Sequence, residues 1–445
     1  MRPHLSRLPM KLRSSLHRTL RRPTRPGVAF ALSAPVLTSR PGSRTGFVVL
    51  AIAIVGFGLV GLTGCGGGDT EAVPPMPELP DAPVLRFSGR PLEWAGEACE
   101  SAILIEAETG TILYEKNSHD RRPPASIAKM MLELVVMREV DAGRLSLNDS
   151  IRVSGSASKL GGSQVYLKQG EVFSLEQMLE AIAIGSANDA CVAVAEHIAG
   201  TPGGFVQLMN READLLRLEA TEYKNVHGLD DDPNAINLTT AFDIAQIARQ
   251  LVQYPDVLRM ASTAEAPFRD GQFILRNTNE LVGRFPGLDG LKTGYTSKAG
   301  FCLCATAKRG DLRLISVVLG CPTNRDRFGV SRELLGLGFG SFLPMEIAKR
   351  GDVIETEVPV AGGTVASIHP VVAHDLTVIV SRPDDRLLET RFVPVEDLQA
   401  PLDPWDPVGE IEVVVDDHVL ATVPVWTPVA VPKSGLGGWL KSRFS

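Results

Sequence analysis

Apolar and polar positions alternate in a way that predicts two β-hairpins within one folded region. Residues 101–117, SAILIEAETGTILYEKN, contain two short apolar runs on either side of a Thr-Gly pair. Residues 301–320, FCLCATAKRGDLRLISVVLG, repeat this arrangement around an Arg-Gly pair. Short apolar runs that flank turn residues are typical of paired antiparallel strands.

Helical periodicity occupies the chain between these hairpins. Residues 127–140, IAKMMLELVVMREV, predict one helix. Residues 174–200 predict a helix, a break at Gly185-Ser186 and a second helix. Because the helices lie between the outer strands in the sequence, we expect an α/β (α+β) fold in which an antiparallel sheet packs against helices.

The pattern changes near residue 350. Short Val-rich runs alternate with Gly, Asp and Pro through residues 351–430, which predicts a small all-β domain after a main domain at 91–350. The tail, 431–445, ends in GLGGWLKSRFS. Its apolar and basic residues fit a weak amphipathic membrane contact, and its glycines fit a frayed terminus equally well.

The N-terminal segment has the pattern of an export signal. Residues 1–46 hold ten Arg and Lys and no acidic residue, and residues 46–65 form an uncharged apolar run. The run ends in Leu-Thr-Gly-Cys65, which resembles the lipobox of bacterial lipoproteins and implies lipidation of Cys65. An uncleaved transmembrane anchor is the alternative, since about 20 apolar residues span a bilayer. Both interpretations export the body and tether it, with residues 66–90 as a Gly/Pro-rich linker.

Composition narrows the function. The 445 residues are 44% hydrophobic and 22% charged, as in a globular protein of two or three domains. Without the leader, the chain has 45 − 10 = 35 basic and 52 acidic residues, a net charge of −17. Such an acidic body argues against nucleic-acid binding, which requires basic surface.

The cysteines beyond Cys65 match no zinc pattern, and we predict no metal or cofactor. They are Cys99, Cys191, Cys302, Cys304 and Cys321. Their apolar neighbours predict small buried side chains. Their odd number leaves at least one unpaired, and the sequence does not assign a disulfide among the others.

Three short motifs of serine chemistry each occur twice in this chain. The pairs are Ser126-Ile-Ala-Lys129 and Ser156-Ala-Ser-Lys159, Ser186-Ala-Asn188 and Ser146-Leu-Asn148, and Lys292-Thr293-Gly294 and Lys433-Ser434-Gly435. Each motif alone is weak evidence, so its context has to decide. The second member of each pair lies in a turn-rich segment or in the tail, which predicts no catalytic role.

Ser126 follows Pro-Pro-Ala and precedes the first predicted helix. An ordinary helix cap is one interpretation. Lys129, however, lies on the same helical face and in the first turn, where the helix dipole disfavours a cation. A lysine there suits a base beside a nucleophile, because the helix end and a second cation would lower its pKa.

The other two motifs lie where side chains or backbone are accessible. Ser186 and Asn188 follow the predicted helix break, which exposes side chains. Lys292 and Gly294 lie on a predicted strand edge just before the second hairpin, where glycine allows a ligand to approach the backbone.

Taken in order, PPASIAKMM, SANDACVAVAEH and DGLKTGYT resemble the three motifs of the penicillin-recognising serine enzymes. They are most similar to the low-molecular-weight penicillin-binding proteins that are D-alanyl-D-alanine carboxypeptidases, serine peptidases of the S11 type. AILIEAETGTILYEKN, GSQVYLKQGE, NVHGLDDD and LRLISVVLGCPTNRDRF resemble further segments of that family in the same order. The likeness covers roughly residues 98–340, and the β-rich remainder suits the family's C-terminal domain.

The resemblance implies a role for each residue of the first two motifs. Ser126 would attack the carbonyl between the two terminal D-alanines of a peptidoglycan stem peptide, with Lys129 as its base. Ser186 would relay a proton to the leaving amine, and Asn188 would hold the substrate amide and Lys129. β-Lactams would acylate Ser126 and leave slowly.

The third motif would bind the substrate. Lys292 would bind the free terminal carboxylate, assisted by Thr293 and Thr296, with Gly294 between them. The backbone N–H groups of Tyr295 and of the nucleophile would form the oxyanion hole.

Three residues depart from the pattern or invite another interpretation. Tyr295 stands where some relatives have histidine, and Ala187 where many have glycine. His227, in NVHGLDDD, has turn-forming neighbours, which favours a loop-structuring role over that of a catalytic base.

Two other functions remain as alternatives. A class A β-lactamase shares the serine–lysine plan but needs a glutamate to activate the deacylating water, and no local motif marks one. A non-enzymatic peptidoglycan-binding or scaffold lipoprotein would need no intact motif, whereas all three motifs are complete.

Overall fold

The computed structural model describes residues 75–76, 92, 98–382, 388–415 and 418–435 of the chain. The predicted export signal, the lipobox with Cys65 and residues 436–445 lie outside this range. Within it, no helix is both long and apolar enough to cross a bilayer.

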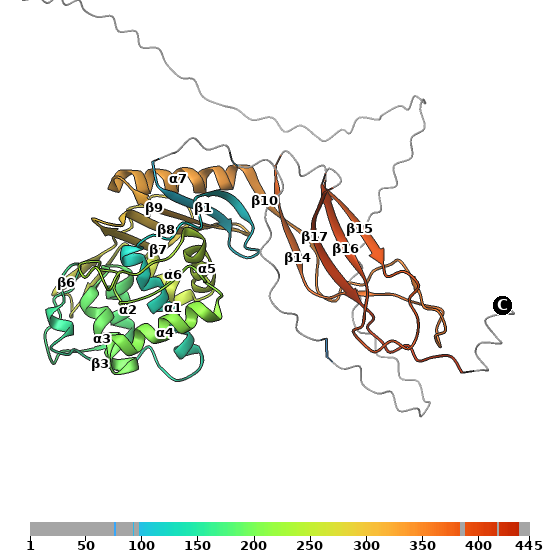
Figure 1. Cartoon of the computed structure of the whole chain (residues 1–445), viewed down its shortest axis with the longest axis horizontal. Coiled ribbons are helices and arrows are strands. Elements are labelled where there is room, and N and C mark those ends of the chain that lie inside the picture. The colour runs from blue at the N-terminus through green and yellow to red at the C-terminus, as the bar shows by residue number, and fades with distance from the viewer. Residues whose placement is uncertain (1–74, 77–91, 93–97, 383–387, 416–417, 436–445) are drawn as a thin grey trace, which may run out of the picture. The chain divides into compact units, whose positions relative to one another are not determined.

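A five-stranded antiparallel sheet organises the first region (Figure 1). Its order is β2-β1-β9-β8-β7. The bounds are β1 Ser101–Glu106, β2 Ile112–Lys116, β7 Leu288–Thr296, β8 Gly300–Arg309 and β9 Leu312–Cys321. Both predicted hairpins are confirmed, because β1 pairs with β2 and β8 pairs with β9, all antiparallel. The predicted strand that carries Lys-Thr-Gly is present as β7, directly before the hairpin β8–β9, and it is an edge strand of this sheet.

Helices cover both faces of the sheet (Figure 1). On one face lie the short η1 (Ala125–Ala128), α1 (Lys129–Asp141), α2 (Leu175–Ala183), α3 (Asn188–Ala199), α4 (Pro202–Leu215), α5 (Ala241–Leu251) and α6 (Pro255–Ser262). On the other lies α7 (Asn324–Ser341). The predicted helix–break–helix is present as α2 and α3, and the fold class is confirmed. Two minor hairpins, β3–β4 (Ser150–Arg152, Val172–Ser174) and β5–β6 (Glu265–Phe268, Phe273–Arg276), lie outside the sheet.

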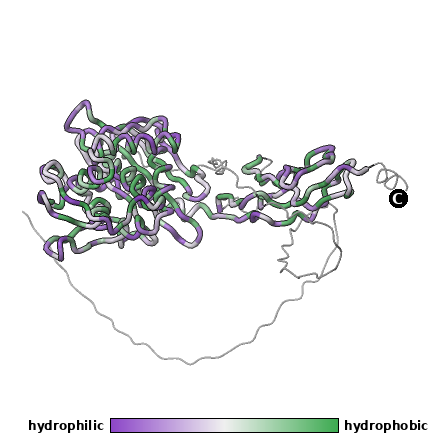
Figure 2. The backbone as a smooth tube through the Cα atoms, turned by 90° about the horizontal axis from the view of Figure 1, so that it is seen from below, coloured by the Kyte–Doolittle hydropathy of each residue, from purple (hydrophilic) through white to green (hydrophobic). Residues whose placement is uncertain are grey.

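Strand residues alternate between two cores. On β1, Ile103 and Ile105 pack with the α1 side, whereas Ala102 and Leu104 pack with the α7 side. A strand buried on both faces needs continuous apolar residues, which explains the unbroken AILI run. Figure 2 shows this distribution, with hydrophobic segments gathered inside the first region and hydrophilic ones at its turns.

The second region is all-β and has its own Val-rich core, as predicted. Strand β10 (Phe342–Ala348) pairs with β14 (Leu376–Ser381). A four-stranded sheet has the order β13 (Val371–Val372), β17 (His418–Trp426), β16 (Pro407–Val415) and β15 (Leu388–Pro394). A separate pair is formed by β11 (Val358–Pro359) and β12 (Ser367–Ile368). Lys433 pairs with Gly363, and the Ser434 N–H donates to the Gly362 carbonyl at 2.8 Å. The second Lys-Ser-Gly triplet therefore belongs to this β-region, whereas the sequence placed it in a frayed tail.

A disulfide between Cys99 and Cys321 closes one end of the main sheet, with its Cα atoms 4.0 Å apart. Cys99 precedes β1, and Cys321 ends the neighbouring strand β9. Cys191, Cys302 and Cys304 are free and buried. The prediction of buried cysteines is thus confirmed, and the pairing is new information from the structure.

Replacing both members of the disulfide by alanine should destabilise the protein. The bond joins residues 222 positions apart, so its loss frees a long loop in the unfolded chain, worth about 2–4 kcal/mol. Urea unfolding with and without reductant measures this difference. Reductant should destabilise the wild-type chain and leave the Cys99→Ala/Cys321→Ala variant unchanged; equal curves for the wild type in both conditions would contradict the prediction.

Candidate active site

The turn η1 places Ser126 directly before helix α1. Neither η1 nor α1 has a side-chain hydrogen bond at its N-terminus, so Ser126 does not cap a helix. The cap interpretation is therefore wrong for this serine. Ala125 has a φ of +49°, an unfavourable conformation for a residue with a side chain, and such strain is typical of functional sites.

Lys129 is fully buried and lies among four oxygen atoms. Its Nζ lies 3.1 Å from Ser126 Oγ and 3.0 Å from Ser186 Oγ. It also lies 2.6 Å from the Ser186 carbonyl oxygen and 2.7 Å from Asn188 Oδ1. The first two motifs of the sequence therefore meet at one nitrogen.

The chemistry of these four oxygens indicates what a neutral Lys129 can do. A neutral amine has two N–H donors and one lone pair. The Ser186 carbonyl and Asn188 Oδ1 only accept hydrogen bonds, so they take both N–H groups. The lone pair then faces the hydroxyls of Ser126 and Ser186, the two groups able to donate. This is the arrangement that a base needs in order to take a hydroxyl proton.

Burial lowers the pKa of Lys129 from its ordinary value, which favours this neutral form. The charges of Cys191, Glu133 and Asp189 oppose the shift. The sequence suggested the helix end and a second cation as the cause, whereas desolvation is the largest cause in the structure.

The break between α2 and α3 presents the second motif. Ser186 has a φ of +59° at the bend and is buried, so the expectation of exposed side chains at this break is wrong. The Asn188 Nδ2 donates to the Gly161 carbonyl at 2.8 Å, which turns Oδ1 toward Lys129. Gly162 lies against the same amide, since a Cβ there would come within 2.5 Å of Nδ2. The segment GSQVYLKQGE therefore supports Asn188 from the side.

Strand β7 lies against the turn that carries Ser126. A Cβ on Gly294 would come within 2.7 Å of the Pro124 carbonyl oxygen and 3.2 Å of the Ser126 nitrogen. Only glycine permits this approach without displacing backbone. The third motif thus joins the other two in one site.

Lys292 is buried in β7, and its Nζ donates to the Thr293 carbonyl at 3.3 Å. Thr293 Oγ1 donates to Thr278 Oγ1 at 2.7 Å. Burial, and then the charge of Lys129, lower the pKa of Lys292. The protonation of each lysine therefore affects the other, and their amino groups belong to adjoining elements of one site.

The two residues after Gly294 have different environments. The Tyr295 side chain is 54% exposed and stacks on Phe301, with ring centroids 4.2 Å apart. Thr296 is buried, and its hydroxyl donates to Asp230 at 2.5 Å. This bond ties β7 to the segment NVHGLDDD.

His227 serves the loop that it lies in. Its Nδ1 accepts the Leu229 N–H at 3.1 Å. Burial, and then the charge of Lys129, lower the pKa of His227 to about 4, so its ring is neutral near pH 7. The structure-forming role preferred from the sequence agrees with this geometry.

The second copies of the motifs have other partners. Ser156 Oγ donates to Glu196 at 2.5 Å in an exposed turn. Ser146 Oγ accepts the Asn148 N–H at 3.2 Å, which is turn chemistry. Neither serine contacts a lysine among the described hydrogen bonds.

Sequence reasoning missed three supporting residues. Asp189 accepts the backbone N–H groups of Val165 and Leu167, which fixes the segment beside Asn188. Arg327, on α7, donates to the Gly294 carbonyl at 2.9 Å and holds β7 from the opposite face of the sheet. Glu133, one turn after Lys129, is buried. Its spacing from Lys129 was visible in the sequence, but its burial was not.

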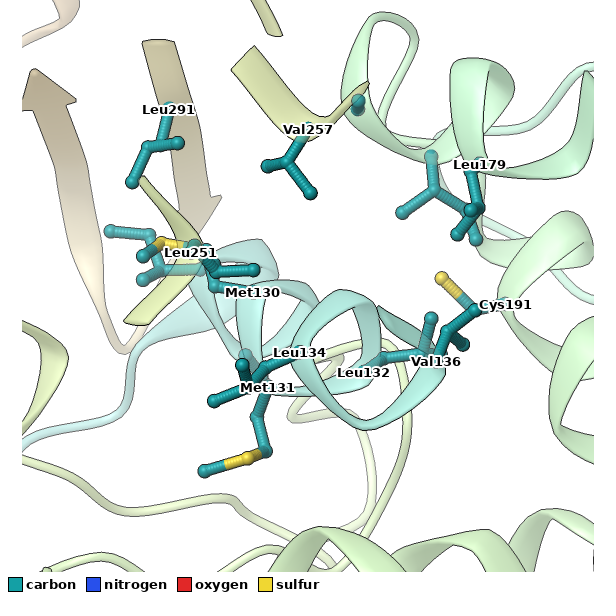
Figure 3. Close-up of a cluster of buried hydrophobic side chains, with 14 of the residues drawn as sticks. Met130, Met131, Leu132, Leu134, Val136, Leu179, Cys191, Leu251, Val257 and Leu291 are labelled. Carbon is teal, nitrogen blue, oxygen red and sulfur yellow. The ribbon is translucent and has the colours of Figure 1, made fainter. Parts of the chain in front are cut away.

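Helix α1 is the centre of the apolar core beneath the site. Figure 3 shows its Met130, Met131, Leu132, Leu134 and Val136 among Leu179, Cys191, Leu251, Val257 and Leu291 from surrounding elements. The first nine residues of α1, Lys129 to Met137, are buried, whereas Arg138 and Asp141 in its last turn are exposed. The turn that carries Ser126 therefore leads directly into the enclosed part of the helix.

Comparison with known proteins agrees with this geometry. Residues 93–323 match the family model described as D-alanyl-D-alanine carboxypeptidase, peptidase S11. Residues 342–433 match the C-terminal domain of penicillin-binding protein 5. The chain belongs to the D-alanyl-D-alanine carboxypeptidase family.

Individual carboxypeptidases of this family match over most of the chain. The D-alanyl-D-alanine carboxypeptidase DacF of Bacillus subtilis is 35% identical over 366 residues, 81% of this chain and 93% of that protein. The structure of penicillin-binding protein 5 from Haemophilus influenzae superposes with a TM-score of 0.70 at 29% identity, covering 76% of this chain and 98% of that one. Penicillin-binding protein D2 from Listeria monocytogenes, in its ampicillin-bound form, has a TM-score of 0.50 at 31% identity over 54% of this chain and 97% of that one.

Proposed function

We propose that this carboxypeptidase removes the terminal D-alanine from peptidoglycan pentapeptide stems through an acyl-enzyme on Ser126. The observation that carries the proposal is the position of Lys129 Nζ, 3.1 Å from Ser126 Oγ, with both of its N–H groups taken by other acceptors. A desolvated base with its lone pair toward a hydroxyl generates a nucleophile.

Acylation follows from this arrangement. The Ser126 hydroxyl proton moves to Lys129 Nζ while Oγ bonds to the carbonyl carbon between the two D-alanines. The N–H groups of Ser126 and Tyr295 stabilise the resulting oxyanion, each worth about 3–4 kcal/mol. The C–N bond then breaks, and the proton passes from Lys129 through the Ser186 hydroxyl to the departing amine.

Deacylation reverses these proton transfers. Lys129 again takes a proton, now from water, as the water oxygen attacks the ester carbonyl. The C–Oγ bond then breaks, and the proton passes from Lys129 back to Ser126 Oγ, which regenerates the free enzyme. A β-lactam acylates Ser126 in the same way, and its ring-opened ester hydrolyses slowly.

Substrate selection rests on Lys292. Its buried ammonium is a site for the free carboxylate of the terminal D-alanine, with the hydroxyls of Thr293 and Thr296 nearby and Gly294 allowing close approach. The amide group of Asn188, whose Oδ1 accepts from Lys129, is the proposed partner of the substrate amide. A terminal carboxylate requirement makes the reaction a carboxypeptidase reaction.

We also propose where the enzyme acts. The basic leader, the apolar run and Cys65 support export and lipid tethering to a membrane, on whose outer side residues 91–350 act on the cell wall. The linker 66–90 gives the catalytic domain reach from this anchor, and residues 351–430 form the attached β-domain.

Release of D-alanine tests the function directly. The full-length chain, purified in detergent, should liberate one D-alanine from a pentapeptide stem, measured by an amino-acid oxidase assay. Labelled penicillin separates the alternatives: stable labelling supports the carboxypeptidase, rapid turnover of penicillin supports the β-lactamase, and the absence of both labelling and D-alanine release supports a scaffold.

A further inference from the structure

Residues 225–230, within NVHGLDDD, contact both elements that carry the proposed oxyanion donors. One donor, the Ser126 N–H, lies on the turn η1, and the other, the Tyr295 N–H, lies on β7. An oxyanion hole works when both donors lie about 3 Å from the point that the oxyanion will occupy. The contacts that fix the spacing of η1 and β7 therefore bear directly on the proposed reaction.

Gly228 forms the contact with the first of these elements. Its φ is +87°, and a Cβ there would come within 1.9 Å of the Ala125 carbonyl oxygen and 3.0 Å of the Ser126 nitrogen. Backbone therefore packs directly on backbone beside the first donor, which only glycine permits. This contact fixes the segment relative to η1.

Asp230 forms the contact with the second element, two positions later. Its Oδ2 accepts the hydroxyl of Thr296 at 2.5 Å, and both residues are 8% exposed. Thr296 directly follows Tyr295, which carries the second donor. The Lys298 ammonium also donates to the Asp230 carbonyl at 2.8 Å, from the turn that follows β7. The neighbours of the two donors are thus joined through the stretch from Gly228 to Asp230.

The hydrogen bonds of Thr296 show how its hydroxyl is used. It donates its proton to Asp230 and accepts the Ala299 N–H at 3.0 Å. A hydroxyl has a single proton, so none is left to donate to a substrate carboxylate. The buried ammonium of Lys292 remains the group that suits this carboxylate.

We propose that Asp230 is a positioning residue of the oxyanion hole, which acts through Thr296 to hold the Tyr295 N–H at its distance from the Ser126 N–H. This inference rests on the proposed acyl-enzyme mechanism. The close contact of Gly294 with the Ser126 nitrogen limits how near the two elements approach. Because β7 is an edge strand that pairs only with β8 in the sheet, the bond to Asp230 restrains it from moving away.

Loss of this bond should slow every acylation that uses the hole. Asp230→Ala removes the acceptor of the Thr296 proton, so the Tyr295 N–H is no longer held in place. Because a displacement of about 1 Å costs up to roughly 100-fold in rate, we expect kcat/KM to fall by about 10- to 100-fold. The loss should be equal for diacetyl-L-lysyl-D-alanyl-D-alanine and for its C-terminal methyl ester, because both form the same oxyanion. The second-order rate of labelling by penicillin should fall by a similar factor.

Further variants make this result specific. Asp230→Asn keeps an oxygen acceptor for Thr296 and should restore most of the wild-type rate. Asp231→Ala changes the exposed neighbouring carboxylate and should leave all of the rates unchanged. Thr296→Val removes the same bond from the other side and keeps the side-chain shape, so it provides the comparison if Asp230→Ala does not fold. The double variant should be no slower than Thr296→Val alone, since both changes remove one interaction.

The other end of the segment is tested at Gly228. Gly228→Ala places a methyl group against the Ala125 carbonyl and should slow the reactions of acid and ester equally. Gly271→Ala creates a similar backbone strain, at a φ of +82°, where nothing lies within 4 Å of the new Cβ, and it should keep wild-type rates. Equal losses in the two glycine variants would assign the effect to strain alone and count against the inference.

The remaining outcomes also contradict the inference. Wild-type rates in Asp230→Ala would mean that the bond serves only the stability of the fold. A larger loss for the acid than for the ester would mean that Asp230 and Thr296 act on the carboxylate. An additive loss in the double variant would assign the effect of Asp230 to another group.

The proposed function can fail separately from this inference. Absence of both D-alanine release and penicillin labelling in the wild-type chain would overturn the acyl-enzyme mechanism, and the inference with it. If the wild-type chain is labelled but releases no D-alanine, the carboxypeptidase assignment fails. The labelling rates of the variants then still decide whether Asp230 positions the oxyanion hole, because acylation by penicillin uses the same two donors.

Discussion

Ser126→Ala should abolish both D-alanine release and stable labelling by penicillin. In the wild-type chain, Ser126 Oγ lies 3.1 Å from Lys129 Nζ. The alanine variant has no hydroxyl there for Lys129 to deprotonate, so no acyl-enzyme forms. Removing the nucleophile of a serine hydrolase lowers kcat by roughly 10⁴–10⁶-fold. Steady-state release from a pentapeptide and gel fluorescence with labelled penicillin measure the two losses.

The chain supplies a matched control for this substitution. Ser156 also stands three residues before a lysine but hydrogen-bonds to Glu196 in an exposed turn. Ser156→Ala should keep wild-type release and labelling. Persistent labelling of Ser126→Ala, or loss of labelling in Ser156→Ala, would show that the nucleophile is misassigned.

Lys292→Ala should impair action on peptides with a free terminal carboxylate. The buried ammonium is the proposed partner of that carboxylate, and removing one member of a buried charge pair costs about 2–5 kcal/mol. We therefore expect kcat/KM for a D-alanyl-D-alanine peptide to fall by roughly 30- to 5,000-fold.

Two comparisons make this result specific. The methyl ester of the same peptide should lose far less, because it carries no charge for Lys292 to bind. Lys433→Ala alters the second Lys-Ser-Gly triplet, which pairs with Gly363 in the β-region, and should have no effect on activity. Undiminished activity of Lys292→Ala on the acid would exclude the carboxylate-binding role.

Local signals in the sequence were sufficient for the elements that carry the motifs. Turn residues marked both hairpins, and Gly185-Ser186 marked the break between α2 and α3. Helix α7 was not predicted, because four glycines in its 18 residues weaken the helical signal. The structure explains one of them: a Cβ on Gly338 would come within 2.6 Å of Leu314, so glycine lets α7 lie close to the sheet.

The residues of the site also fall into those that could be predicted from the sequence and those that could not. The sequence predicted Ser126, Lys129 and Lys292 in one site, and the structure places them together. The contact of Arg327 with β7 and the burial of Glu133 could not be recognised from the sequence, because both are produced by distant segments of the chain. An arginine or a glutamate on a helix is ordinary until the fold removes it from water.

The disulfide between Cys99 and Cys321 affects how the chain responds to proteolysis. All three motifs lie between these two residues, inside one closed ring of backbone. A single proteolytic cut at any surface loop of this ring opens it without producing two separate molecules. Ser126 and Lys292 then stay covalently connected until a reductant divides the fragments.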